Sequence, residues 1–117
     1  MIRTAREFEV AIEKRLVQVN QENKNAQNVL YGYADDLPDK EYEYLRYELP
    51  AIQELFEGID RWLKEKHPTY IQIFDMLNKS YNKHNDIANG RYGGTQVTYS
   101  RYKAKKLKQI IGTFQVA

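Results

Sequence analysis

The residues best suited to chemistry in this 117-residue chain lie near its end, where bases, tyrosines and glycines are interleaved. Lysine and arginine side chains neutralise phosphates, tyrosine rings stack on bases, and glycines let a backbone approach a ligand closely. Together they predict sequence-nonspecific contact with nucleic acid, because nothing in the pattern places side chains in a groove to read bases. The predicted nucleic-acid-binding residues are Arg91, Tyr92, Arg101, Tyr102, Lys103, Lys105, Lys106 and Lys108.

Charge is distributed unevenly along the sequence. Residues 87–117 contain six bases and no acid, whereas residues 35–66 contain ten acids and five bases. If all six bases met phosphates, the affinity for duplex DNA would fall with a log-log salt slope of at most about −5. The other interpretation is a solvated C-terminal helix whose lysines keep the protein in solution or pair with the acidic region.

The acidic region predicts a second kind of binding surface. A helix that carries carboxylates along one side imitates a phosphate backbone or binds a basic surface on another protein. The ten tyrosines favour this interpretation, since tyrosine is enriched at binding surfaces. An ordinary solvated helix face and a low-GC coding bias are the alternatives. The predicted partner-binding residues are Glu43, Tyr44, Tyr47, Glu54, Glu57 and Asp60.

Neither a catalytic site nor a metal site is predicted. The carboxylates between Asp35 and Glu43 are expected in a loop and a first helical turn, whereas acid-base catalysis needs a sheltered pair. His67 and His84 have no second ligand at metal spacing. The glycines of the final segment match neither the phosphate-binding loop nor the dinucleotide fingerprint. We therefore expect a protein that is not an enzyme and uses no cofactor.

Composition limits the class of protein further. The chain has no cysteine, which excludes disulfides and thiolate chemistry. No apolar run approaches the roughly 20 residues that a membrane-spanning helix needs. The first ten residues also lack the apolar block of a secretory signal. We expect a cytoplasmic protein that does not contact a membrane.

The element that must position these residues is a long helix in the middle of the chain. Apolar side chains recur there at steps of three and four residues, which predicts one seam buried against other helices. Pro50 lies inside this pattern and would cost about 3 kcal/mol in a straight helix. Because the rhythm keeps its phase, we predict one helix kinked at Pro50, with a break near Leu49 as the alternative. The seam consists of Tyr42, Leu45, Leu49, Ile52, Phe56, Ile59 and Leu63.

Two further helices are expected beside it. Thr4 and Glu7 have the spacing of a capping box at the start of the first helix, and Gly32 is its expected end. The stretch 20–25 is rich in asparagine, so either tertiary contacts hold it or the helix is irregular there. The third helix is expected over residues 69–88, because its apolar residues repeat at helical spacing and Asn89-Gly90 is a termination signal.

The residues after Gly90 differ in character. Residues 91–100 contain two glycines and an alternating stretch, which predict a loop or a short extended piece, and Ser100 is expected to cap a basic C-terminal helix. We therefore predict a mainly α fold, an antiparallel three-helix bundle with a kinked central helix, followed by this loop and helix. The single domain 1–117 would comprise a helical body over 1–90 and a basic loop and C-terminal helix over 91–117.

The function predicted from these patterns is that of a non-enzymatic binding or regulatory protein. It would act on a nucleic-acid-handling system and contact nucleic acid, or a nucleic-acid-binding protein, through its basic C-terminal segment. The alternative is a small inhibitor or adaptor of the phage or mobile-element type, for example a CRISPR nuclease antagonist. Such a protein would bind its partner through the acidic, tyrosine-rich surface. A homodimer is also compatible with the seam, since the seam packs on its own chain or on a copy.

Overall fold

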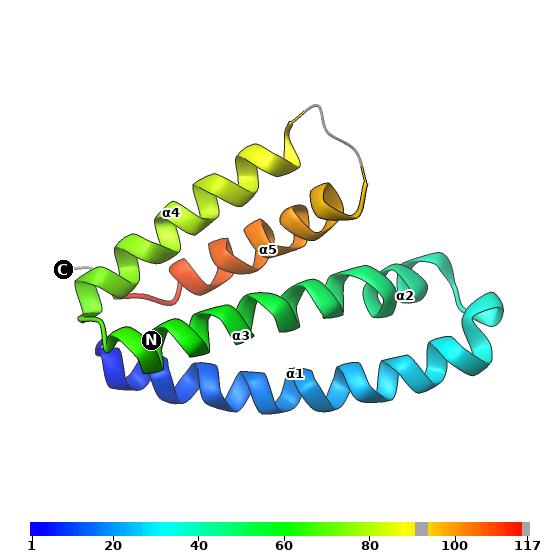
Figure 1. Cartoon of the computed structure of the whole chain (residues 1–117), viewed down its shortest axis with the longest axis horizontal. Helices are drawn as coiled ribbons and strands as arrows, with labels where there is room; N and C mark the ends of the chain where they lie inside the picture. Colours follow the sequence, from blue (N-terminus) through cyan, green and yellow to red (C-terminus); the bar gives the residue numbers. More distant parts are fainter. Residues whose placement is uncertain (91–93, 116–117) are drawn as a thin grey trace.

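Long helices make up most of the fold in the computed structural model, which describes residues 1–90 and 94–115. The longest within these residues are α1 (Ala5–Tyr33), α3 (Leu49–Lys66), α4 (Tyr70–Ala88) and α5 (Thr95–Ile111). Successive long helices alternate in direction (Figure 1). The mainly α prediction is confirmed. The three-helix bundle is not confirmed, because α5 packs along α4 and also contacts α3.

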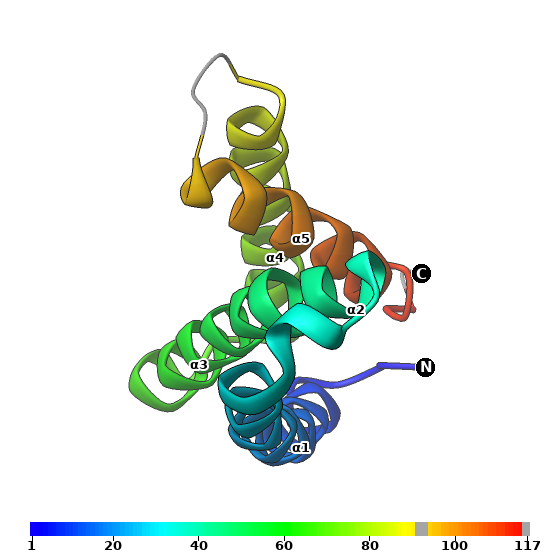
Figure 2. The same cartoon turned by 90° about the vertical axis from the view of Figure 1, so that its right-hand side faces the viewer.

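The central position belongs to α3, which lies between α1 and the α4/α5 pair (Figure 2). The predicted seam supplies much of its buried face: Leu49, Phe56, Ile59 and Leu63 are buried, and Leu45 and Ile52 pack against them while half-buried. Burial is therefore confirmed for four of the seven predicted seam residues, while Tyr42, Leu45 and Ile52 are half-buried. Ala51 and Leu55 are buried as well, so the face that α3 uses for packing is wider than the seam. The three-and-four spacing did not predict these two residues.

The helix continues through Pro50, although proline has no backbone N–H to donate to the preceding turn. The short helix α2 (Asp39–Glu43) continues into the π-helical segment η2 (Tyr44–Glu48), which continues directly into α3. The amide of Leu49 donates to the carbonyl of Tyr44, five residues back, so the turn before the proline is wider than an α-helical turn. A wider turn gives the proline ring room beside the preceding carbonyls. The predicted kink at Pro50 is not confirmed.

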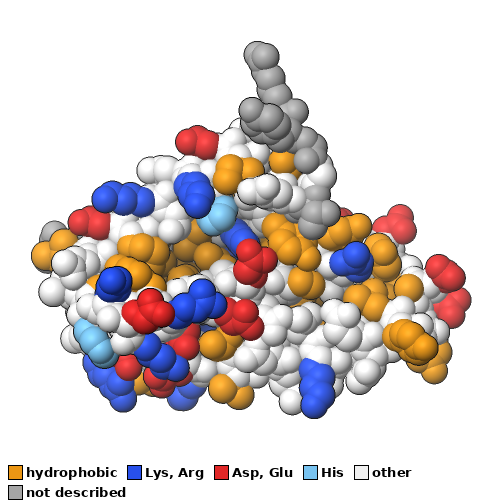
Figure 3. Space-filling view, in the orientation of Figure 1, with side chains coloured by type: hydrophobic (Ala, Val, Ile, Leu, Met, Phe, Trp, Pro, Cys, Tyr) orange, Lys and Arg blue, Asp and Glu red, His pale blue; other side chains and the backbone are white. Residues whose placement is uncertain are grey.

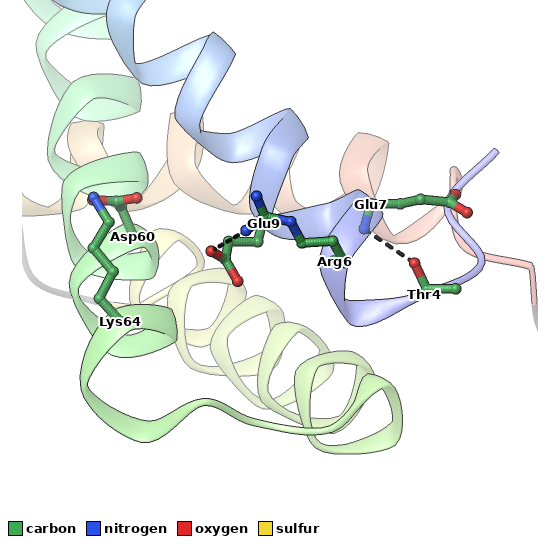
Figure 4. A network of polar contacts seen from close by, with 6 residues as sticks. All are labelled: Thr4, Arg6, Glu7, Glu9, Asp60 and Lys64. Atoms are coloured by element: carbon green, nitrogen blue, oxygen red, sulfur yellow. Dashed lines mark hydrogen bonds and ion pairs between the residues drawn. The ribbon is translucent and has the colours of Figure 1, made fainter.

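The first helix begins where its cap predicts. The amide of Glu7 donates to Thr4 Oγ1 at 3.1 Å, and the Glu7 carboxylate accepts from the amide of Arg3 rather than from that of Thr4. Figure 4 shows this cap together with two ion pairs, Arg6–Glu9 of α1 and Asp60–Lys64 of α3. The predicted end at Gly32 is close, since α1 ends at Tyr33 and passes into the 3-10 turn η1 (Ala34–Asp36).

The asparagine-rich stretch of α1 is helical throughout and is held by tertiary contacts. Gln53 of α3 donates to Asn20 Oδ1 at 2.7 Å and accepts a hydrogen bond from Asn23. These hydrogen bonds to α3 stabilise the helical conformation of a stretch in which asparagine has low helix propensity. Of the two alternatives for this stretch, tertiary support is the one observed.

The segment between α4 and α5 differs from the prediction. Arg91, Tyr92 and Gly93 lie outside the described residues. From Thr95 onward the chain is helical, so the loop or extended piece was wrong for residues 95–100. Gly94 has a φ of 99°, a conformation that favours glycine, and it is the residue from which α5 starts. Ser100 therefore lies inside α5, where it is 2% exposed, and is not the N-cap.

The two ends of the described chain are joined. The amide of Ile2 donates to the carbonyl of Thr113 at 2.8 Å, and the amide of Gln115 donates to the carbonyl of Ile2 at 2.9 Å. Tyr70 of α4 donates its hydroxyl toward the carbonyls of both Ile2 and Gln115. We call this arrangement the terminal clasp. It places Phe114, 7% exposed, in the same core as the helices.

Candidate nucleic-acid interface

The bases of α5 point in different directions around the helix. At 3.6 residues per turn, Arg101, Lys105 and Lys108 fall within about 60° of one another, whereas Lys103 and Lys106 lie on the opposite side. The predicted basic patch is therefore divided. Figure 3 shows the face seen in Figure 1, on which acidic and basic side chains are interspersed and hydrophobic ones show between the upper and lower helix pairs.

Part of the patch contacts carboxylates of α2, η2 and α3. Lys103 Nζ lies 2.7 Å from Glu54 Oε1 and its side chain is only 12% exposed, while Lys105 Nζ lies 3.8 Å from Glu48 Oε1. The Tyr102 hydroxyl donates to Glu43. Burial and this hydrogen bond raise the pKa of Tyr102 to about 12. Tyr102 and Lys103, predicted to bind nucleic acid, thus contact Glu43 and Glu54, predicted to bind a protein.

The other part borders a groove between α4 and α5. Arg101, Lys105 and Lys108 line it from α5, and the groove has a volume of about 370 Å³. Lys105 keeps 66% of its side chain exposed despite its long contact with Glu48, and Arg101 and Lys108 are exposed. From α4 the groove is lined by Tyr81, Asn85, Ala88 and Asn89.

This groove combines three features that suit a phosphate backbone. Its described lining residues include three cations and no carboxylate. Asn85 and Asn89 add amide groups of the kind that bond to phosphate and sugar oxygens. Tyr81, half-buried, adds an aromatic ring. Sequence reasoning missed the α4 residues, because their positions on α4 carry no charge and only the packing of α4 on α5 brings them beside the bases.

The predicted partner-binding residues are dispersed over several environments. Glu43 and Tyr47 line a hollow with Asp39, Tyr42 and Arg101. The Tyr42 and Tyr47 rings meet edge to face with their centroids 6.4 Å apart. The remaining predicted residues are engaged elsewhere or exposed: Tyr44 donates to Glu22 of α1, Glu54 pairs with Lys103, Asp60 pairs with Lys64, and Glu57 is exposed.

A serine and a histidine meet on the inner side of α5, but their geometry does not suit nucleophilic catalysis. His84 Nδ1 lies 3.3 Å from Ser100 Oγ. Burial, followed by the nearby charges of Lys103 and Lys83, lowers the pKa of His84. Because Ser100 is 2% exposed, a substrate cannot reach its hydroxyl. The pair instead satisfies a buried hydroxyl between α4 and α5.

Residues 1–90 and 94–115 hold no cluster of three or more His, Cys, Asp or Glu side chains that could bind a metal ion. None of the helices they form combines the length and the apolar character needed to cross a bilayer.

Comparison with known proteins identifies no relative. No protein-family model matches the sequence, no curated protein matches it, and no solved structure matches the fold.

Proposed function

We propose that this protein is a non-enzymatic binding protein that contacts nucleic acid, without sequence preference, through the groove between α4 and α5. Arg101, Lys105 and Lys108 carry the proposal, because they form one exposed stripe along a groove whose described lining includes no carboxylate. The stripe spans eight residues of α5, Arg101 to Lys108, and the seven steps between them rise about 10 Å at 1.5 Å per residue. That length corresponds to roughly three phosphates of one strand at 3.4 Å each.

The remaining lining residues favour backbone contact over base reading. Asn85 and Asn89 reach phosphate or sugar oxygens, and a tyrosine ring such as that of Tyr81 stacks on any base. The protein would act in a regulatory role within a nucleic-acid-handling system, with the acidic helix α3 holding α5 in place.

Removing the stripe should abolish binding. We expect the triple variant Arg101→Gln, Lys105→Gln, Lys108→Gln to bind a fluorescein-labelled 20-nucleotide DNA at least about a hundredfold more weakly than the wild type, since each charge-assisted contact contributes about 1 kcal/mol or more. Fluorescence anisotropy at low salt measures the affinity. Single-stranded and duplex forms, as DNA and as RNA, would be compared.

Two control variants distinguish binding in the α4/α5 groove from a general effect of lowering the net charge. The variant Lys14→Gln, Lys24→Gln, Lys40→Gln removes the same charge from exposed positions elsewhere and should bind nearly as well as the wild type. Lys103→Gln, on the inner side of α5, should also leave the affinity within about threefold. Equal losses in both triple variants, or no binding by the wild type, would overturn the proposal.

A second candidate function rests on the hollow beside α2. Asp39, Glu43, Tyr42 and Tyr47 line it beside Arg101. The two carboxylates and the aromatic faces suit a lysine or arginine side chain of a basic protein. In this function the protein is an inhibitor or adaptor that binds a nucleic-acid-binding protein.

A charge change at the hollow tests this second candidate. We expect Asp39→Asn to weaken retention of a fluorescent arginine-rich peptide at least about threefold, while Glu41→Gln, on the same helix but outside the hollow, leaves it unchanged. Equal retention by both variants would rule the hollow out as the binding site.

A further inference from the structure

A second, apolar pocket lies away from the α4/α5 groove, where the start of α1 meets α3 and α5. Its volume is about 300 Å³, and its walls are largely the rings and aliphatic side chains of Phe8, Ile12, Phe56 and Ile110. Ala11 also lines it and is half-buried, so a larger side chain there would occupy the space. Such a combination of apolar walls and few polar groups is the usual form of a small-molecule site.

The charged side chains that line this pocket are two cations, and Gln109 and Thr113 add neutral polar groups. Arg15 of α1 and Lys106 of α5 line it together, and none of its other lining residues within 1–90 and 94–115 is acidic. Neither cation lies within ion-pair distance of a carboxylate in the described part of the chain, unlike Lys103 and Lys105 on the same helix. Burial, followed by repulsion from Arg15, lowers the pKa of Lys106. The carboxylates of Glu48 and Glu22 offset this lowering only in part. A half-buried lysine and an exposed arginine beside one apolar pocket, neither of them in an ion pair with another described residue, favour an anionic ligand.

The pocket's size limits the apolar part of that ligand. At roughly 30 Å³ for each heavy atom, the liquid volume of a water-sized group, 300 Å³ holds about ten heavy atoms. An eight-carbon carboxylate has that number. Its chain would replace water against Phe8 and Phe56, and its head group would lie between Arg15 and Lys106.

We propose that this pocket binds a medium-chain carboxylate, with the carboxylate held by Arg15 and Lys106 and the alkyl chain inserted between α1, α3 and α5. Octanoate is the probe of choice. For a ligand of about ten heavy atoms we expect a Kd in roughly the 0.1–1 mM range. This site is independent of the nucleic-acid groove, since the two share no lining residue.

Charge and shape are tested by NMR titration of the ¹⁵N-labelled full-length protein. Octanoate should shift the amide signals of residues around the pocket, and octanol, of equal chain length but neutral, should bind at least about fivefold more weakly. Lys106→Gln should weaken octanoate binding to a similar extent. Lys108→Gln is the matched control, because Lys108 faces the other groove, and it should leave octanoate binding unchanged.

Shape is tested by filling the pocket. Ala11→Leu should abolish saturable octanoate binding. If that variant unfolds, the double variant Arg15→Gln, Lys106→Gln serves instead, since both residues lie at the rim of the core. Octanol binding as tightly as octanoate, binding that Lys106→Gln leaves unchanged, or wild-type binding by folded Ala11→Leu would each overturn the proposal.

Discussion

Truncating Phe56 to alanine should lower the free energy of unfolding by about 3–5 kcal/mol. The side chain is 2% exposed and belongs to the core that α1, α3 and α5 share. Alanine would lose the transfer free energy of a phenyl ring and leave a cavity beside the existing apolar pocket, which Phe56 also lines. Urea denaturation followed by circular dichroism measures the change, and an unchanged m-value would show that the unfolded states are comparable.

The neighbouring residue provides the control for this truncation. Glu57 is exposed on α3, so Glu57→Ala should change the free energy of unfolding by no more than about 0.5 kcal/mol. A loss below about 1 kcal/mol for Phe56→Ala would mean that the seam faces solvent or a partner, which contradicts the observed packing.

Truncating Phe114 to alanine should have a similarly large effect, also about 3–5 kcal/mol. Its ring centroid lies 5.3 Å from that of Phe8, 5.3 Å from that of Tyr70 and 5.8 Å from that of Phe74. Phe114 therefore joins α1 and α4 through the terminal clasp. The corresponding fall in Tm should be at least about 10 °C, measured by calorimetry.

Tyr31 is a suitable control for aromatic truncation. It is 96% exposed on α1, so Tyr31→Ala should leave Tm within about 2 °C of the wild type. If Phe114→Ala behaved like Tyr31→Ala, the terminal clasp would not contribute to the stability of the folded protein in solution.

The seam of α3 and the ends of two helices could be predicted from patterns that act within a few residues. The seam of α3 could be predicted because its residues recur at helical spacing, and burial follows from that periodicity alone. The start of α1 at Thr4 and the end of α3 before His67 and Pro68 follow from capping residues that act within one turn.

Two features of the fold could not be predicted from the sequence, because they depend on contacts between residues far apart in the chain. The alternating residues 95–99 suit a strand by pattern, but no strand partner exists for them among the described residues, and packing on α4 makes them helical. The pairing of Ile2 with Phe114 joins residues from opposite ends of the chain. No local pattern encodes such a contact.

The candidate site was predictable only in part. The identity of the bases came from composition, but their grouping depends on the angle at which each one leaves α5. The basic helix predicted after Ser100 already contained Arg101, Lys105 and Lys108, but nothing in the sequence showed that this side of the helix lies beside α4. The pairing of Lys103 with Glu54 was foreseen as a general alternative, whereas the contribution of Tyr81 required the structure.

The salt dependence of nucleic-acid binding tests the central claim most directly, because its slope counts the phosphates that the protein neutralises. Three cations in the α4/α5 groove predict a log-log slope of about −2.7 for duplex DNA and about −2.1 for single strands, and Lys108→Gln should reduce its magnitude by about one unit. A slope near −5, unchanged by Lys108→Gln, would mean that the bases of α5 act as one undivided patch and would contradict this account.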